Sequence, residues 1–87
     1  MITKKVKITN KLGFHARPAN NFVKMAQTFK SKIEIVKDTK RTDAKSILGL
    51  LGLGVQSGAE IELVADGEDE QDAVNKLIAF IESGLGE

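Results

Sequence analysis

Apolar and polar residues alternate at the start of the chain, and this alternation predicts a half-buried strand over residues 2–9. Ile2, Val6 and Ile8 fall on one side of that strand, and threonine and lysine occupy most positions on the other. From Ala16 to about Phe29 the apolar residues recur at spacings of three and four, which is typical of an amphipathic helix packed by one stripe. The apolar positions of this helix are Ala19, Phe22, Val23, Ala26 and Phe29.

The middle of the chain predicts a hairpin followed by a short helix. Residues 32–36 and 40–43 flank Asp38 and Thr39, which are compatible with a turn. Ser46 then precedes an apolar run, as an N-cap residue does, although the glycines in that run weaken a helix. We therefore expect a short helix that ends near Leu53.

The last third predicts one more strand and one more helix. Residues 59–66 alternate again, with their apolar side chains on one face. The acidic stretch that follows favours a helix N-terminus, and a helix from there would end at Gly84. The apolar positions expected to be buried in this helix are Ala73, Val74, Leu77, Ile78 and Ile81.

The resulting order of elements is βαββαβα, without a long loop or an internal repeat. A chain of 87 residues has the size of one domain, so residues 1–87 are expected to form a single domain around one core. The economical architecture for this order is an α+β fold, in which an antiparallel sheet carries helices on one face.

Composition narrows the function classes. The chain has no cysteine, which excludes disulfides and thiolate metal sites, and no apolar run approaches the ~18 residues of a membrane span. The N-terminal residues lack the pattern of a signal peptide, so a cytoplasmic location is expected. Residues 1–45 hold 12 Lys and Arg against 3 Asp and Glu, whereas residues 46–87 hold 1 against 9. Either the fold interleaves these halves, or it presents a basic face to an acidic or phosphate-bearing partner.

The stretch KLGFHARPANNF, residues 11–22, contains the candidate chemistry. If a helix begins at Ala16, Pro18 lies in its first turn, where a missing N–H costs no hydrogen bond, and His15 lies at or next to the N-cap. The unpaired backbone N–H groups of Ala16 and Arg17, together with the helix dipole, would then bind an anion such as phosphate.

The histidine and the arginine suit phosphoryl transfer in particular. The neutral imidazole of a histidine such as His15 is a nucleophile. Arg17 adds a permanent cation whose planar donors match phosphate oxygens. On spacing alone, however, a lone histidine at a helix start is more often a cap or a surface residue.

Two motifs give the chain a resemblance to a known family. GFHARPA, residues 13–19, and KSILGLLGLGV, residues 45–55, resemble the two signatures of HPr, the histidine-containing phosphocarrier of the bacterial phosphotransferase system. The resemblance covers essentially the whole chain. It implies an open-faced β-sandwich, in which a four-stranded antiparallel sheet carries three helices on one face.

The same resemblance implies an activity. His15 would accept a phosphoryl group at Nδ1 from the phosphohistidine of enzyme I and pass it to an EIIA domain, while Arg17 steadies the phosphate. Such a protein is a shuttle without turnover of its own, not an enzyme, and it needs no metal or cofactor.

Ser46 has two interpretations. It is a plain N-cap whose hydroxyl bonds a backbone N–H of the next turn. Alternatively, the resemblance implies a regulatory site for HPr kinase/phosphorylase, although the same serine also occurs in family members from bacteria without that kinase.

The apolar residues around Ser46 cannot all be buried. Ile47, Leu48 and Leu51 cannot all face the core together with Leu50 and Leu53, because side chains at these five positions point around most of the circumference of a short helix. The alternatives for the first three are a place in the core or an exposed patch that docks enzyme I and EIIA domains together with residues near His15. The residues expected in this patch are Ile47, Leu48 and Leu51, with Asn20 and Lys24. A small chain that meets its partners transiently is expected to be a monomer.

Two alternative functions stay open. Gly49 and Gly52 fit the GxxG of a KH nucleic-acid module, but the residues between them are leucines, and four phenylalanines without Tyr or Trp offer bases little to stack on. Within the HPr family, a nitrogen-related or purely regulatory paralogue is the other alternative. His15 excludes the paralogues that have lost the histidine.

Overall fold

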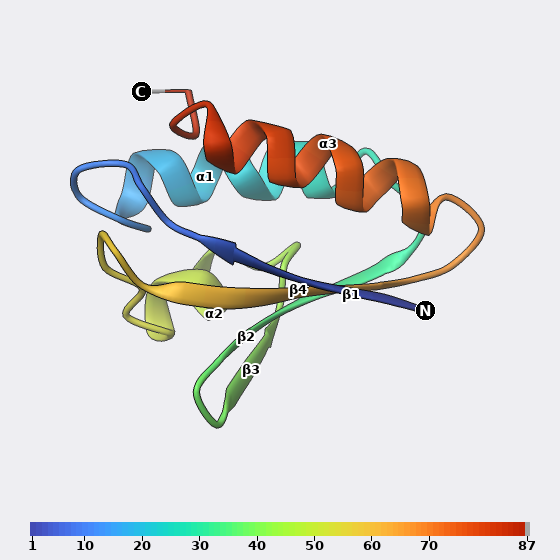
Figure 1. Ribbon diagram of the computed structural model, residues 1–87, viewed down its shortest axis with the longest axis horizontal. Helices are drawn as coiled ribbons and strands as arrows, with labels where there is room; N and C mark the ends of the chain where they lie inside the picture. Colours follow the sequence, from blue (N-terminus) through green and yellow to red (C-terminus); the bar gives the residue numbers. More distant parts are fainter. Residues whose placement is uncertain (87) are drawn as a thin grey trace.

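The computed structural model describes residues 1–86 and has the expected βαββαβα order (Figure 1). The strands in this part of the chain are β1 (Ile2–Lys7), β2 (Lys32–Lys37), β3 (Lys40–Asp43) and β4 (Glu60–Asp66). The helices are α1 (Ala16–Ala26), α2 (Ile47–Gly52) and α3 (Glu70–Glu82). The predicted fold class is therefore confirmed.

The strands form one antiparallel sheet in the order β1-β4-β2-β3. The alternation seen in the sequence places one apolar row of each central strand on the same face, because successive side chains of a strand point to opposite sides. In the register, Ile35 of β2 lies opposite Leu63 of β4, and Val6 of β1 lies opposite Ile61. This apolar face forms one wall of the core.

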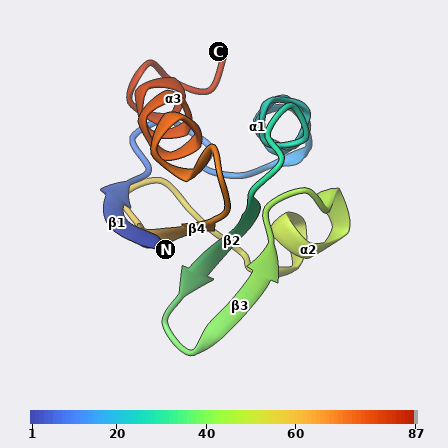
Figure 2. The same cartoon turned by 90° about the vertical axis from the view of Figure 1, so that its right-hand side faces the viewer.

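The helices cover that face. Figure 2 shows α1 and α3 side by side over the sheet, with α2 next to α1 and β3. Their apolar stripes supply the other wall of the core, in which Phe22 of α1, Leu50 of α2 and Leu77 of α3 are completely buried. None of the helices within residues 1–86 is long and apolar enough to cross a bilayer.

Several element ends shift by one to three residues from the expectations, and one burial differs. Helix α1 ends at Ala26 instead of Phe29, because the N–H groups of Thr28 and Phe29 bond carbonyls only three residues back, and this tighter turn still buries Phe29. Strand β1 ends at Lys7, although Ile8 stays buried and bonds the carbonyl of Ala59. Ile78 is half-buried, not buried.

The sheet interleaves the basic and acidic halves of the chain. Strand β4, from the acidic half, lies between β1 and β2 from the basic half. The facing pairs are Lys5 with Glu62, Lys7 with Glu60, and Lys32 with Asp66. Opposite charges in such cross-strand positions stabilise a sheet modestly. On the sheet, the fold therefore interleaves the two charged halves of the chain.

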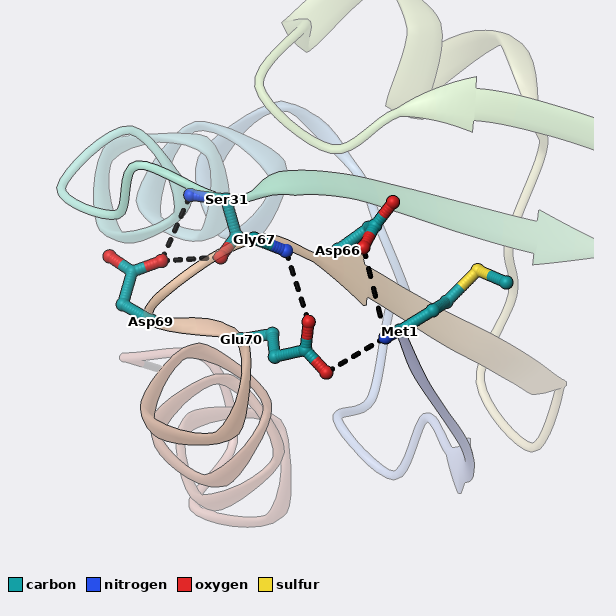
Figure 3. A network of polar contacts seen from close by, with 6 residues as sticks. All are labelled: Met1, Ser31, Asp66, Gly67, Asp69 and Glu70. Carbon is teal, nitrogen blue, oxygen red and sulfur yellow. Dashed lines mark hydrogen bonds and ion pairs between the residues drawn. The ribbon is translucent and has the colours of Figure 1, made fainter.

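Two carboxylates tie the start of α3 to distant segments (Figure 3). Asp69 does not cap its own helix; its carboxylate accepts bonds from the N–H groups of Lys30 (2.8 Å) and Ser31 (2.9 Å) and from the Ser31 hydroxyl. Glu70 accepts a bond from the Gly67 N–H at 3.1 Å and pairs with the Met1 ammonium at 2.9 Å. These contacts hold the α1–β2 turn and the start of strand β1 against the beginning of α3.

The Asp69 contacts make stability depend on pH. The Ser31 hydroxyl, with the backbone N–H groups, lowers the pKa of Asp69 from 3.8 to about 2. A depressed carboxyl pKa contributes stability above the unfolded value, and this contribution is lost as the pH falls through about 2. We expect Asp69→Asn to lower the melting temperature at pH 7 by a few °C, with a difference from wild type that narrows between pH 4 and pH 2.

Melting curves followed by circular dichroism measure this difference. Glu68→Gln is the matched control, because the Glu68–Lys30 pair is exposed on both sides and should contribute little. An equal loss for Asp69→Asn at pH 7 and at pH 2 would show that the charge of Asp69 is irrelevant.

Candidate functional site

His15 is the N-cap residue of α1. Its backbone is extended (φ −85°, ψ −175°), and its carbonyl accepts the first helical bond, from the Ala19 N–H at 3.0 Å. Its side chain does not cap the helix and is partly exposed. The predicted place of the histidine, at the helix end and outside the core, is therefore what the structure has.

The first turn of α1 is built to attract an anion. The N–H groups of Ala16 and Arg17 precede the first N–H that bonds within the helix, and Pro18 has no N–H to leave unpaired. The first turn carries no acidic residue, and the Arg17 side chain is exposed. The helix end thus offers two backbone donors and a guanidinium on the same turn as the imidazole.

The residues before His15 hold its backbone in place. Gly13 has φ +66°, a conformation that favours glycine, and a Cβ there would lie 2.7 Å from the Cα of Gln56. Phe14 is buried, and its ring packs against that of Phe22 with 5.5 Å between the centroids. Only glycine fits this close approach, and the buried Phe14 ring holds the position that follows.

Ser46 caps α2. Its hydroxyl oxygen accepts a bond from the Gly49 N–H at 3.1 Å, so the capping interpretation is confirmed. Gly49 lies against β3, where a Cβ would overlap the hydroxyl of Thr42. The partly exposed Ser46 side chain leaves the second interpretation, regulatory phosphorylation, as a prediction.

Helix α2 exposes its apolar side chains as the crowding argument predicts. Leu48 is 84% exposed, Leu51 38% and Ile47 37%, whereas Leu50 and Leu53 are buried. Because α1 and α2 pack against each other, this apolar patch lies on the helix next to the one that carries His15. Asn20 is half-buried and Lys24 is exposed on α1.

Sequence reasoning missed Leu12 as an exposed residue. It is 63% exposed, three positions before His15, and an apolar residue between Lys11 and Gly13 in a loop was the available signal. The KH interpretation has no support in the geometry, because Gly49 and Gly52 lie inside α2 and Leu50 between them is buried.

Two hollows lie near the helices, but neither is lined by His15 or Arg17. One, of about 760 Å³, runs between α1 and α3 past Met25 and Phe80; the other, of about 400 Å³, lies beside Leu12. Within residues 1–86, no group of His, Asp and Glu side chains is arranged to hold a metal ion. His15 is partly exposed at the helix end, so a group that another macromolecule presents can reach it.

The family described as the PTS HPr component phosphorylation site matches residues 2–83. The HPr-like protein Crh of Halalkalibacterium halodurans is 50% identical over 82 residues, which cover 94% of this chain and 98% of that protein. The phosphocarrier protein HPr of Neisseria meningitidis is 41% identical over 87 residues, which cover all of this chain and 98% of that protein.

Solved structures agree with these relatives. The structure of HPr-C-His from Thermoanaerobacter tengcongensis superimposes with a TM-score of 0.96 at 46% identity and covers 100% of this chain and 98% of that one. Crh of Bacillus subtilis, described as a domain-swapped, intertwined dimer, superimposes with a TM-score of 0.78 at 45% identity over 97% of each chain. Fold, motifs and relatives agree that the chain belongs to the HPr family of phosphocarrier proteins.

Proposed function

We propose that this chain carries a phosphoryl group on His15 from enzyme I to EIIA domains in sugar uptake, in the cytoplasm. The single observation that supports the proposal is the place of His15: a partly exposed imidazole at the N-cap of α1, next to the backbone donors of Ala16 and Arg17. No other residue of the chain combines an imidazole with an anion-binding helix end, because His15 is the only histidine.

The proposed step exchanges one nitrogen–phosphorus bond for another. The lone pair of His15 Nδ1 forms the new N–P bond as the N–P bond of the donor phosphohistidine breaks, and the donor imidazole keeps the electron pair of the broken bond. The Ala16 and Arg17 N–H groups and the Arg17 guanidinium would bind the equatorial oxygens, which supplies the positioning and charge neutralisation that phosphoryl transfer needs. The product keeps its transfer potential, so the same step can run onward to EIIA.

A second candidate function is purely regulatory, including a nitrogen-related branch. It is favoured by the 50% identity to a Crh protein, a relative that is named HPr-like. The carrier function is favoured by His15 itself, since a family member without the histidine has no nitrogen to phosphorylate there.

Phosphorylation by a purified donor tests the carrier function. The chain is incubated with enzyme I and labelled phosphoenolpyruvate, and the label on the protein is tested for stability. A phosphate on nitrogen is lost in acid and kept in base, and we expect this behaviour. A chain that takes up no label under conditions that phosphorylate a known HPr would refute the carrier function.

We further propose that Ile47, Leu48 and Leu51, with Asn20 and Lys24, form the docking surface for enzyme I and EIIA domains. Apolar side chains exposed beside a reactive group are typical of a transient protein interface. Leu48 is the most exposed of the three, so a substitution there should change docking without changing the core.

The variant Leu48→Asp is expected to raise the KM for transfer from enzyme I about tenfold, because a carboxylate would have to be desolvated in the interface. The saturating rate and the melting temperature should stay near wild type. Ala79→Asp, which adds the same charge at an exposed position of α3, is the matched control. An unchanged KM for Leu48→Asp would place the docking surface elsewhere.

The oligomeric state belongs to the proposal as well. A domain-swapped dimer of Crh shows that a related sequence dimerises. We propose that this chain acts as a monomer, since a carrier must present one face to two partners in turn, and a mass measurement in solution at working concentration tests it. Regulation by HPr kinase/phosphorylase at Ser46 is likewise proposed.

A further inference from the structure

One peptide bond just before His15 is held at both of its polar groups. The carbonyl of Gly13 accepts a bond from the Asn10 side-chain amide at 2.7 Å, and the N–H of Phe14 donates to the carbonyl of Val55 at 3.0 Å. These two groups belong to the same peptide plane. A peptide plane whose C=O and N–H are both hydrogen-bonded cannot rotate without losing at least one of these two bonds.

The Asn10 side chain is buried, so water cannot readily replace the hydrogen bond that its amide makes. It is 7% exposed, and among residues 1–86 only Asn10 and Ser31 are buried polar side chains. The backbone carbonyl of Asn10 also accepts a bond from the Gly13 N–H at 3.3 Å, so both the backbone and the side chain of Asn10 close the turn. A buried donor that satisfies a backbone carbonyl is expensive to remove, because the carbonyl is then left unpaired.

The loop between β1 and α1, residues 8–15, is anchored on both sides of this turn. On one side, Ile8 makes two backbone hydrogen bonds to the segment 54–59. Its N–H donates to the carbonyl of Ala59 (2.8 Å), and its carbonyl accepts a bond from the Gly58 N–H (2.7 Å). On the other, the Phe14 ring is buried against Phe22. Between these anchors, the Asn10 amide is the side-chain contact to the Gly13–Phe14 peptide.

We propose that Asn10 is a positioning residue for phosphoryl transfer at His15. By fixing the Gly13–Phe14 peptide, it sets the direction in which the chain enters His15 and so aligns the imidazole with the Ala16 and Arg17 N–H groups. This inference rests on the proposed carrier function. Small errors of alignment are costly in such a step, since a misplacement of about 1 Å can slow a reaction about 10²-fold.

The test compares Asn10→Ala with Asn75→Ala. Asn75 is exposed on α3 and accepts a bond from the Gln71 side chain, so its replacement is a matched loss of an asparagine away from the site. Transfer from enzyme I and phosphoenolpyruvate is measured over a range of concentrations of each variant, at a temperature where both variants are folded. We expect the saturating rate of Asn10→Ala to fall about tenfold, with KM within about twofold of wild type.

A second measurement reads the loop directly. Amide hydrogen exchange at Phe14 should accelerate in Asn10→Ala relative to global unfolding and stay unchanged in Asn75→Ala. Asn10→Ser, which keeps a short donor, serves if the alanine variant does not fold, and it should lie between wild type and the expected alanine phenotype.

The outcomes distinguish failure of the positioning role from failure of the carrier function. A folded Asn10→Ala that transfers at the wild-type saturating rate, or that changes only KM, overturns the positioning role while the carrier function stands. A wild-type chain that accepts no phosphate overturns the carrier function itself, and this role with it.

Discussion

The variant His15→Ala is expected to take up no acid-labile phosphate from enzyme I and phosphoenolpyruvate, a loss of at least about 10³-fold in the rate of labelling. The chain has no other histidine that could replace it. The fold should survive, because the His15 side chain does not cap α1 and is not part of the buried core.

Rapid-quench labelling followed by mass spectrometry measures the loss, and melting curves confirm the fold. Ser46→Ala is the control, since it removes a hydroxyl that could carry an acid-stable phosphate but leaves the imidazole in place. Retention of an acid-labile label by His15→Ala would mean that another group accepts the phosphate.

The variant Ser46→Asp is expected to slow phosphorylation by enzyme I about tenfold or more without lowering the melting temperature. The Ser46 oxygen accepts the Gly49 N–H, and a carboxylate can accept the same bond at a helix end that favours negative charge. The charge would lie next to the exposed Ile47 and Leu48, so docking would require its desolvation and would repel an acidic partner.

Ser46→Asn is the matched control, because asparagine caps a helix as well as aspartate and carries no charge. It should transfer at the wild-type rate. Raising the salt concentration should recover part of the rate of Ser46→Asp, since exposed charges are screened. Equal rates for Ser46→Asp and Ser46→Asn would show that charge at this position does not regulate docking.

The candidate site was predictable because its signals are local. A helix start can be read from Pro18 and from the apolar spacing that follows, and these place His15 at the N-cap. The cap at Ser46 depends on residues three apart, and the exposure of Leu48 follows from the geometry of one short helix. None of these conclusions requires a distant contact.

The contacts between segments distant in the sequence were not predictable. Asp69 has the acidic character of an N-cap, but its carboxylate bonds Ser31, 38 positions away. Asn10 lies in an unremarkable polar stretch, and nothing in that stretch indicates that Val55 will bond the peptide after Gly13.

The sequence by itself determined the order of the elements, the apolar face of each, and the position of His15 at a helix end. These follow from periodicities of two and 3.6 residues, which each segment carries within itself. Only the tertiary structure decided the strand order β1-β4-β2-β3, the interleaving of the two charged halves and the anchoring of the loop before His15. Those features depend on which segments meet, and a periodicity specifies the buried face of a segment but not its partner.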